Sequence, residues 1–299
     1  MTRWERSLLV ISWLAVLALS TAGLLLYRHY YEDGTVFDGA TVPLFPQNVG
    51  PQFAANTFLN REVEEKKIRR TLEMLRAAGA GYLRQQFPWD EIERPAKGQY
   101  LDPVIGTATW EKYDRIVQLA EEYGLEIIAR VDRSPAWARP DGTSPERPPD
   151  NPEDYADFIE AFVRRYRGRI HYLQIWNEPN RYEDWGSQPV DPAGYVRLLK
   201  LASARAKAVD PTIQILAAGL APTIETGPNN LSELLYLEEM YRLGAKDAFD
   251  IMGAMAYGLF RGPHDRRVDP LRVNASRLLL LRAVMERYGD SDKPIWVSE

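Results

Sequence analysis

Residues 172–180 read YLQIWNEPN, and this stretch decides how the rest of the sequence is interpreted. Its first five residues are a short apolar run, which predicts a buried β-strand. Pro179 ends that strand, because proline lacks an N–H donor and fixes φ. The strand therefore delivers an amide and a carboxylate, Asn177 and Glu178, at its carboxyl end.

A short apolar run, a turn and an amphipathic stretch alternate along the whole chain from residue 48. Strands are expected at 49–56, 81–87, 125–131, 170–176, 213–218, 249–256 and 294–298. Helices are expected between them at 62–78, 110–123, 152–167, 192–208, 231–243 and 271–288. Strands that are apolar throughout, as at 213–218, are typical of parallel strands covered on both faces.

Strand starts about 32 to 45 residues apart have the spacing of a βα unit. A parallel sheet built this way is a doubly wound sheet or a (β/α)8 barrel. The first strand is not followed by a glycine-rich loop, which weakens the nucleotide-binding alternative. The sequence thus predicts an α/β fold, a (β/α)8 TIM barrel that lacks its eighth βα unit.

A second strand, 294–297, also stops at a carboxylate, that of Glu299. Functional residues of a barrel gather at the carboxyl ends of its strands, so Glu178 and Glu299 are expected to share one cleft. Two facing carboxylates are the minimum equipment for cleaving a glycosidic bond.

Three motifs in the sequence resemble those of clan A glycoside hydrolases: IWNEPN at 175–180, PIWVSE at 294–299 and YLRQQFPW at 82–89. Within that clan the chain is most similar to family 39 and to the cellulase-like family 5, over roughly residues 48 to 299. The resemblance implies retaining hydrolysis of β-linked poly- or oligosaccharides, without a metal or organic cofactor. It also implies truncation after the nucleophile strand, in an incomplete copy of a longer enzyme.

The resemblance assigns a role to five residues. Glu178 matches the general acid/base and Glu299 the nucleophile, while Asn177 matches the residue that binds the sugar 2-hydroxyl. Arg84 matches the arginine that keeps the nucleophile ionised, and Tyr257 matches a tyrosine that contacts the nucleophile. A guanidinium lowers the pKa of a neighbouring carboxyl, whereas an acid catalyst needs a pKa raised by burial or by negative charge.

Aromatic and charged side chains near other strand ends are further candidates for sugar contact. Trp89, Trp137 and Trp185 fall in loops after strand ends, where they either stack on sugar rings or pack in the core. Arg130 and Asp132 have i, i+2 spacing on one strand and point the same way, as an ion pair or as sugar ligands.

The N-terminus contains 21 uncharged residues from Ser7 to Tyr27, enough to span about 30 Å as a helix. Arg3 and Arg6 precede it, which predicts a cytoplasmic N-terminus. We expect residues 1–31 to be a membrane anchor; a cleaved signal peptide is the alternative.

The expected organisation is completed by a linker at 32–47 and a glycoside hydrolase barrel at 48–299. Either fate of the N-terminal segment puts the barrel outside the cytoplasm, anchored to the membrane or secreted.

Composition excludes several other classes of protein. The 299 residues include no cysteine, which excludes a disulfide scaffold and a Cys-ligated metal site. Three histidines and a net charge of −5 argue against a three-histidine metal site and a nucleic-acid binder. Two alternatives to a hydrolase stay open, namely a non-catalytic carbohydrate-binding protein on the same scaffold and a transglycosylase.

Overall fold

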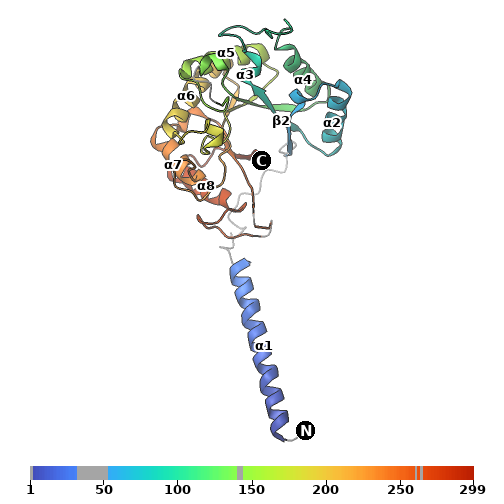
Figure 1. Cartoon of the computed structure of the whole chain (residues 1–299), viewed down its shortest axis with the longest axis vertical. Helices are drawn as coiled ribbons and strands as arrows, with labels where there is room; N and C mark the ends of the chain where they lie inside the picture. Colours follow the sequence, from blue (N-terminus) through green and yellow to red (C-terminus); the bar gives the residue numbers. More distant parts are fainter. Residues whose placement is uncertain (1–2, 32–52, 140–143, 260, 263–264) are drawn as a thin grey trace.

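The computed structural model describes residues 3–31, 53–139, 144–259, 261–262 and 265–299 (Figure 1). It consists of a long N-terminal helix, α1 (Arg3–Tyr31), and an α/β domain that begins near residue 53. The predicted linker 32–47 lies outside the described residues.

The described part of the domain contains the seven expected strands. They are β1 (Ala54–Thr57), β2 (Tyr82–Pro88), β3 (Glu126–Asp132), β4 (Tyr172–Ile175), β5 (Gln214–Ala217), β6 (Met252–Ala254) and β7 (Ile295–Val297). The expected helices are α2 (Glu65–Ala77), α4 (Glu111–Glu122), α5 (Pro152–Tyr166), α6 (Pro192–Val209), α7 (Glu233–Arg242) and α8 (Arg277–Arg287). The short helix α3 (Trp89–Ile92) and four 3-10 turns were not predicted.

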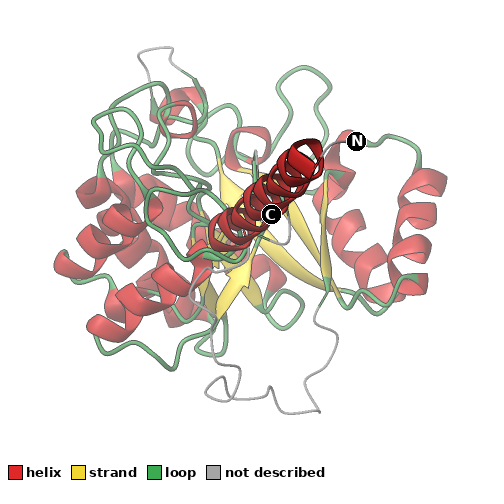
Figure 2. Ribbon diagram, turned by 90° about the horizontal axis from the view of Figure 1, so that it is seen from below, coloured by secondary structure: helices red, strands yellow, loops and turns green. Residues whose placement is uncertain are grey.

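The strands follow one another in chain order and run parallel. β1 to β5 form one sheet and β6 pairs with β7, while the single bridges Leu216–Ile251 and Leu220–Ala254 join β5 to the β6 segment. Figure 1 shows helices α2 to α8 in an arc around the C-terminus, and Figure 2 shows helices on both sides of the central strands. The predicted α/β barrel fold is thereby confirmed.

Side chains alternate between two cores. The main core lies between the strands and the helices and contains residues such as Leu83, Ala129 and Ile175. A smaller cluster of Ile128, Leu216 and Ile251 has separate packing partners. This division reflects the two faces of each parallel strand, because successive residues point to opposite faces.

Three aromatic rings from strands distant in the sequence meet in the smaller cluster. Tyr82 on β2, Tyr172 on β4 and Trp296 on β7 have ring centroids 5.0 to 5.7 Å apart. Trp296 therefore ties β7 to strands on the opposite side of the array. It lies three residues before Glu299, so this contact helps to position that glutamate.

Helix α1 stands apart from these cores. Its stretch Arg3–Tyr27 is long and apolar enough to cross a membrane, and none of it is buried. At 1.5 Å per residue its 25 residues extend about 38 Å, more than a hydrocarbon core of about 30 Å. Both an anchor and a signal sequence have these properties.

A fully buried arginine links α8 to two loops at the α7 end of the domain. Arg277 forms an ion pair with Glu233, and both side chains are only 2% exposed. Its guanidinium also donates to the backbone oxygens of Pro270, at 2.6 Å, and Thr223, at 3.1 Å, and to Ser232 Oγ at 3.2 Å. All three nitrogens are used, which is what a buried guanidinium requires.

The substitution Arg277→Met should lower the free energy of unfolding by about 3–5 kcal/mol, because it leaves a buried carboxylate without its cation. Urea denaturation followed by circular dichroism measures this change. Arg287→Met on the same helix is the matched control, since that side chain is 61% exposed and should shift stability by less than about 0.5 kcal/mol. Equal effects of the two substitutions would contradict a stabilising role for the buried pair.

Candidate active site

The chain leaves β4 through an unusual backbone conformation. Trp176 and Glu178 both have positive φ, 68° and 38°, which costs non-glycine residues about 1–3 kcal/mol each. Contacts on both sides hold this conformation. Glu178 N donates to Gly219 O at 3.2 Å, and the Asn180 amide exchanges two hydrogen bonds with the backbone of Ala221. The loop therefore fixes where Glu178 lies.

Arg84 on β2 is the centre of the site. Its buried guanidinium donates to Glu299 Oε1 at 2.7 Å and to Asn56 Oδ1 at 2.7 Å. It also donates to Asn177 Oδ1 and to Gln174 Oε1, each at 2.8 Å. The structure thus brings the predicted arginine, amide and strand-end glutamate into direct contact.

Glu299 is held in its ionised form. Burial opposes the charge, but hydrogen bonds from the Tyr257 hydroxyl and from Arg84 outweigh it, helped by the charges of Arg84 and Arg130. The pKa of Glu299 is consequently lowered. Tyr257 contacts Glu299 Oε2 and Arg84 contacts Oε1, so each oxygen has its own donor.

Glu178 has the opposite environment. Burial is the main cause that raises its pKa to about 7, and the negative charges of Asp184 and Glu299 add to it. Arg181, whose Nη1 lies 3.3 Å from Glu178 Oε2, acts in the other direction. Near neutral pH the one carboxyl can therefore give up a proton while the other is ionised.

Asn177 has an unused donor next to these two carboxyls. Its Oδ1 accepts from Arg84, so its amide nitrogen points elsewhere, and that nitrogen donates to none of the described residues. Asn177 also lines a small cavity of about 70 Å³ between β3 and the loop after β4. The amide is therefore free to bind a ligand at this edge.

Two of the three loop tryptophans pack in the core, which is one of the two alternatives that the sequence left open for them. Trp89 is completely buried, stacks on Phe158 and donates to Glu93 Oε2 at 2.6 Å. Trp185 is 3% exposed and packs between Trp176 and a buried tyrosine. Neither ring has a face left for a sugar.

The third of these tryptophans, Trp137, is half-buried. Its indole nitrogen donates to Glu93 O at 2.8 Å, and its ring meets the edge of Trp89. Its role as a stacking surface stays a prediction.

Sequence reasoning missed three of the groups that surround the two glutamates: Asn56, Arg181 and Asp184. Arg181 and Asp184 follow the NEP motif in an irregular loop, for which no periodic pattern exists. The Arg130–Asp132 pair was left open; Arg130 Nε lies 2.9 Å from Asp132 Oδ2, although the geometry is not that of a hydrogen bond. Arg130 Nη1 also reaches within 3.8 Å of Glu299 Oε1.

No protein-family model and no curated protein sequence matches the chain. Its fold resembles that of a family 39 glycoside hydrolase from the gut symbiont Bacteroides cellulosilyticus, with TM-score 0.57 and 23% identity. It also resembles a monomeric β-xylosidase from Caulobacter crescentus, with TM-score 0.57 and 18% identity, and an endo-β-1,4-mannanase from Thermotoga petrophila, with 0.56 and 15%.

These three structures are matched over most of this chain but only part of their own. The alignments cover 83%, 82% and 82% of this chain and 48%, 52% and 60% of the respective structures. The chain thus spans about half the length of the glycosidases that it resembles. At this identity the likeness establishes the fold that they share.

The opposite pKa shifts predict opposite effects of two isosteric substitutions on stability. Folded Glu178 keeps its proton up to about pH 7, whereas an ordinary glutamate loses it near 4.5. The contribution of Glu178 to the free energy of unfolding is therefore complete below pH 4.5 and is lost as the pH rises through 7. Glu178→Gln should raise the unfolding free energy at pH 8, by on the order of 2–3 kcal/mol, and change little at pH 4.

Glu299→Gln is the matched comparison. The depressed pKa of Glu299 means that its ionised form stabilises the fold at pH 8 and that this contribution is lost in acid. This variant should be less stable than the native chain at pH 8. Urea unfolding of both variants at pH 4 and pH 8 tests the pair, and changes of the same sign would refute the assigned protonation states.

Proposed function

We propose that the chain is a retaining glycoside hydrolase that cleaves β-linked poly- or oligosaccharides. One observation carries the proposal: two glutamates at the ends of β4 and β7 have opposite pKa shifts, and the ionised one is held by Arg84 and Tyr257. The barrel shared with known glycosidases supports it as an analogy of fold.

The proposed reaction has two displacements at the anomeric carbon. In the first, a Glu299 oxygen attacks that carbon while Glu178 gives its proton to the departing glycosidic oxygen, which leaves a glycosyl ester on Glu299. In the second, Glu178 removes a proton from water as the water oxygen attacks the same carbon, and the ester bond breaks. Asn177 would donate a hydrogen bond to the sugar 2-hydroxyl. Arg84 would stabilise the negative charge of the Glu299 carboxylate when the ester bond breaks.

The environment of each glutamate suits its proposed step. Glu299 must be a carboxylate to attack, and its two hydrogen bonds keep it so. Glu178 must hold a proton near neutral pH, and burial provides this. Once Glu299 is esterified, one negative charge near Glu178 disappears. Its pKa should then fall, which favours its second role as a base.

Covalent labelling tests the proposal. The chain of residues 1–299, in detergent, is treated with 2-deoxy-2-fluoro-β-glycosyl fluorides of xylose, glucose and mannose, and intact mass and peptide mapping follow. We expect one adduct, on Glu299, with at least one of these sugars. Glu299→Gln should give none. Glu178→Gln should still be labelled, because fluoride leaves without a proton, but should release the sugar at least a hundredfold more slowly.

The control for these variants is Glu126→Gln, an exposed glutamate at the start of β3, which should label like the native chain. An adduct on any residue other than Glu299 would overturn the assignment of the nucleophile. Sugar binding without an adduct would favour a non-catalytic carbohydrate-binding protein. Faster release by an added acceptor sugar than by water would identify a transglycosylase.

We further propose that α1 is an uncleaved membrane anchor that holds the domain outside the cytoplasm. The support is the uncharged stretch Ser7–Tyr27 of this unburied helix, which Arg3 and Arg6 precede. Expression in cells followed by alkaline carbonate extraction should leave the protein in the membrane fraction, with residues 1–31 present by mass. A soluble product that begins near residue 23 would show a cleaved signal peptide instead.

A further inference from the structure

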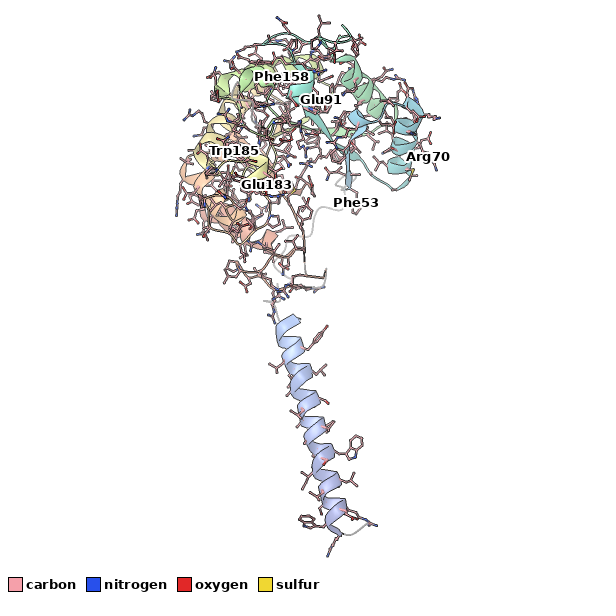
Figure 3. The ribbon with its side chains drawn as sticks, in the orientation of Figure 1. Phe53, Arg70, Glu91, Phe158, Glu183 and Trp185 are labelled. Carbon is pink, nitrogen blue, oxygen red and sulfur yellow. The ribbon has the colours of Figure 1, made fainter. Side chains whose placement is uncertain are left out.

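The small cavity beside Asn177 contains two charged groups, Arg130 and Asp184, that form or break no bond in the proposed reaction. It is bounded by β3, by the end of β4 and by the 3-10 turn η3 (Glu183–Trp185). Arg130 and Asp184 both line it, together with the buried residue Trp176. Figure 3 labels Glu183 and Trp185, the residues on either side of Asp184.

Arg130 supplies the cavity with hydrogen-bond donors. Its side chain is 12% exposed, and none of its nitrogens makes a hydrogen bond to the part of the chain that the structure describes. Asp132 lies opposite Nε and Glu299 lies 3.8 Å from Nη1, so both charges hold the guanidinium in place. The terminal nitrogens of Arg130 therefore have donors to spare.

Asp184 gives the cavity an acceptor. Its backbone oxygen accepts from Trp176 Nε1 at 3.2 Å, which fixes the residue at the cavity. Its carboxylate is three-quarters buried and lies 3.5 Å from Arg181 Nη1, and it accepts no hydrogen bond from the described residues. The carboxylate thus has unfilled acceptor positions in a confined space.

The other charged groups of the cavity are already paired. Gln86 donates to Asp132 at 2.7 Å, and Arg133 binds Asp90 on one side and Glu146 on the other. Arg130 and Asp184 therefore supply the remaining hydrogen-bonding capacity. A cation in the cavity would be repelled by Arg130, and an anion would be repelled by Asp184. A neutral group therefore suits the cavity better than either ion.

We propose that this cavity is a subsite for one uncharged hydroxyl group of the substrate sugar, with Arg130 as its donor and Asp184 as its acceptor. A hydroxyl donates and accepts at once, as these two walls require. The cavity has a volume of about 70 Å³, which leaves room for a hydroxyl or hydroxymethyl group. The inference rests on the proposed function, because it takes a glycoside as the ligand.

The test uses p-nitrophenyl 1-thio-β-glycosides, which are not cleaved, and their 3-, 4- and 6-deoxy forms. Their configuration is that of the sugar that labels Glu299, or gluco if none does. Calorimetry gives the Kd for the detergent-solubilised chain. Removal of one hydroxyl should weaken binding by about ten- to a hundredfold, because it leaves charged groups without a partner.

In Asp184→Asn and in Arg130→Met, removal of that hydroxyl should weaken binding by less than twofold. The loss of affinity on removal of each other hydroxyl should be the same as in the native chain. A purely structural role would weaken all ligands alike, and this result would overturn the proposal. Arg164→Met and Asp292→Asn, both exposed and remote, are the matched controls. If Arg130→Met does not fold, the isosteric Asp184→Asn decides.

Other outcomes separate this inference from the proposed reaction. A label on Glu299 without any hydroxyl-specific penalty means a hydrolase that lacks this subsite. A penalty without a label means that the subsite exists in a chain that forms no covalent intermediate. Tighter binding of the glucuronide, which carries a carboxylate in place of the hydroxymethyl group, would overturn the specificity for a neutral group. Failure of all the thioglycosides to bind would also overturn the proposal.

Discussion

The buried guanidinium of Arg84 is the contact on which the rest of the site depends. It hydrogen-bonds side chains from β1, from β4 and the loop after it, and from the residues that follow β7. A cation in this position needs a counter-charge and a partner for each donor, since burial without them costs several kcal/mol. Glu299 is ionised because Arg84 requires it, so one interaction serves both the fold and the chemistry.

The two glutamates differ because of what the fold places around each. Glu299 meets two donors, whereas Glu178 is buried near like charges and the half-exposed Arg181. The positive φ of Trp176 and Glu178 shows that the chain accepts local strain to set up this contrast. The loop that carries Glu178, the proposed acid, thus contains strained backbone, as is common at functional sites.

The sequence predicted the elements and the main pair because both depend on short-range patterns. Strand and helix periods located the elements of the barrel, and strand ends located Glu178 and Glu299. Patterns do not reveal which way a loop side chain turns, so the sequence left open whether Trp89 packs in the core or faces the cleft. The contact of Trp296 with Tyr82 and Tyr172 depends on barrel curvature, which is a long-range property, and the Arg130–Asp184 cavity depends on a loop without a repeat.

The separation of Arg84 from Glu299 along the chain, 215 residues, has a consequence for how the protein folds. Contacts between such distant residues form only after the intervening segments are ordered, because the entropy of closing so long a loop must first be offset. Neighbouring βα units can dock as soon as each is made. The contact between Arg84 and the proposed nucleophile forms only when β7 joins them, so a chain arrested at any earlier stage can be compact and still lack the site.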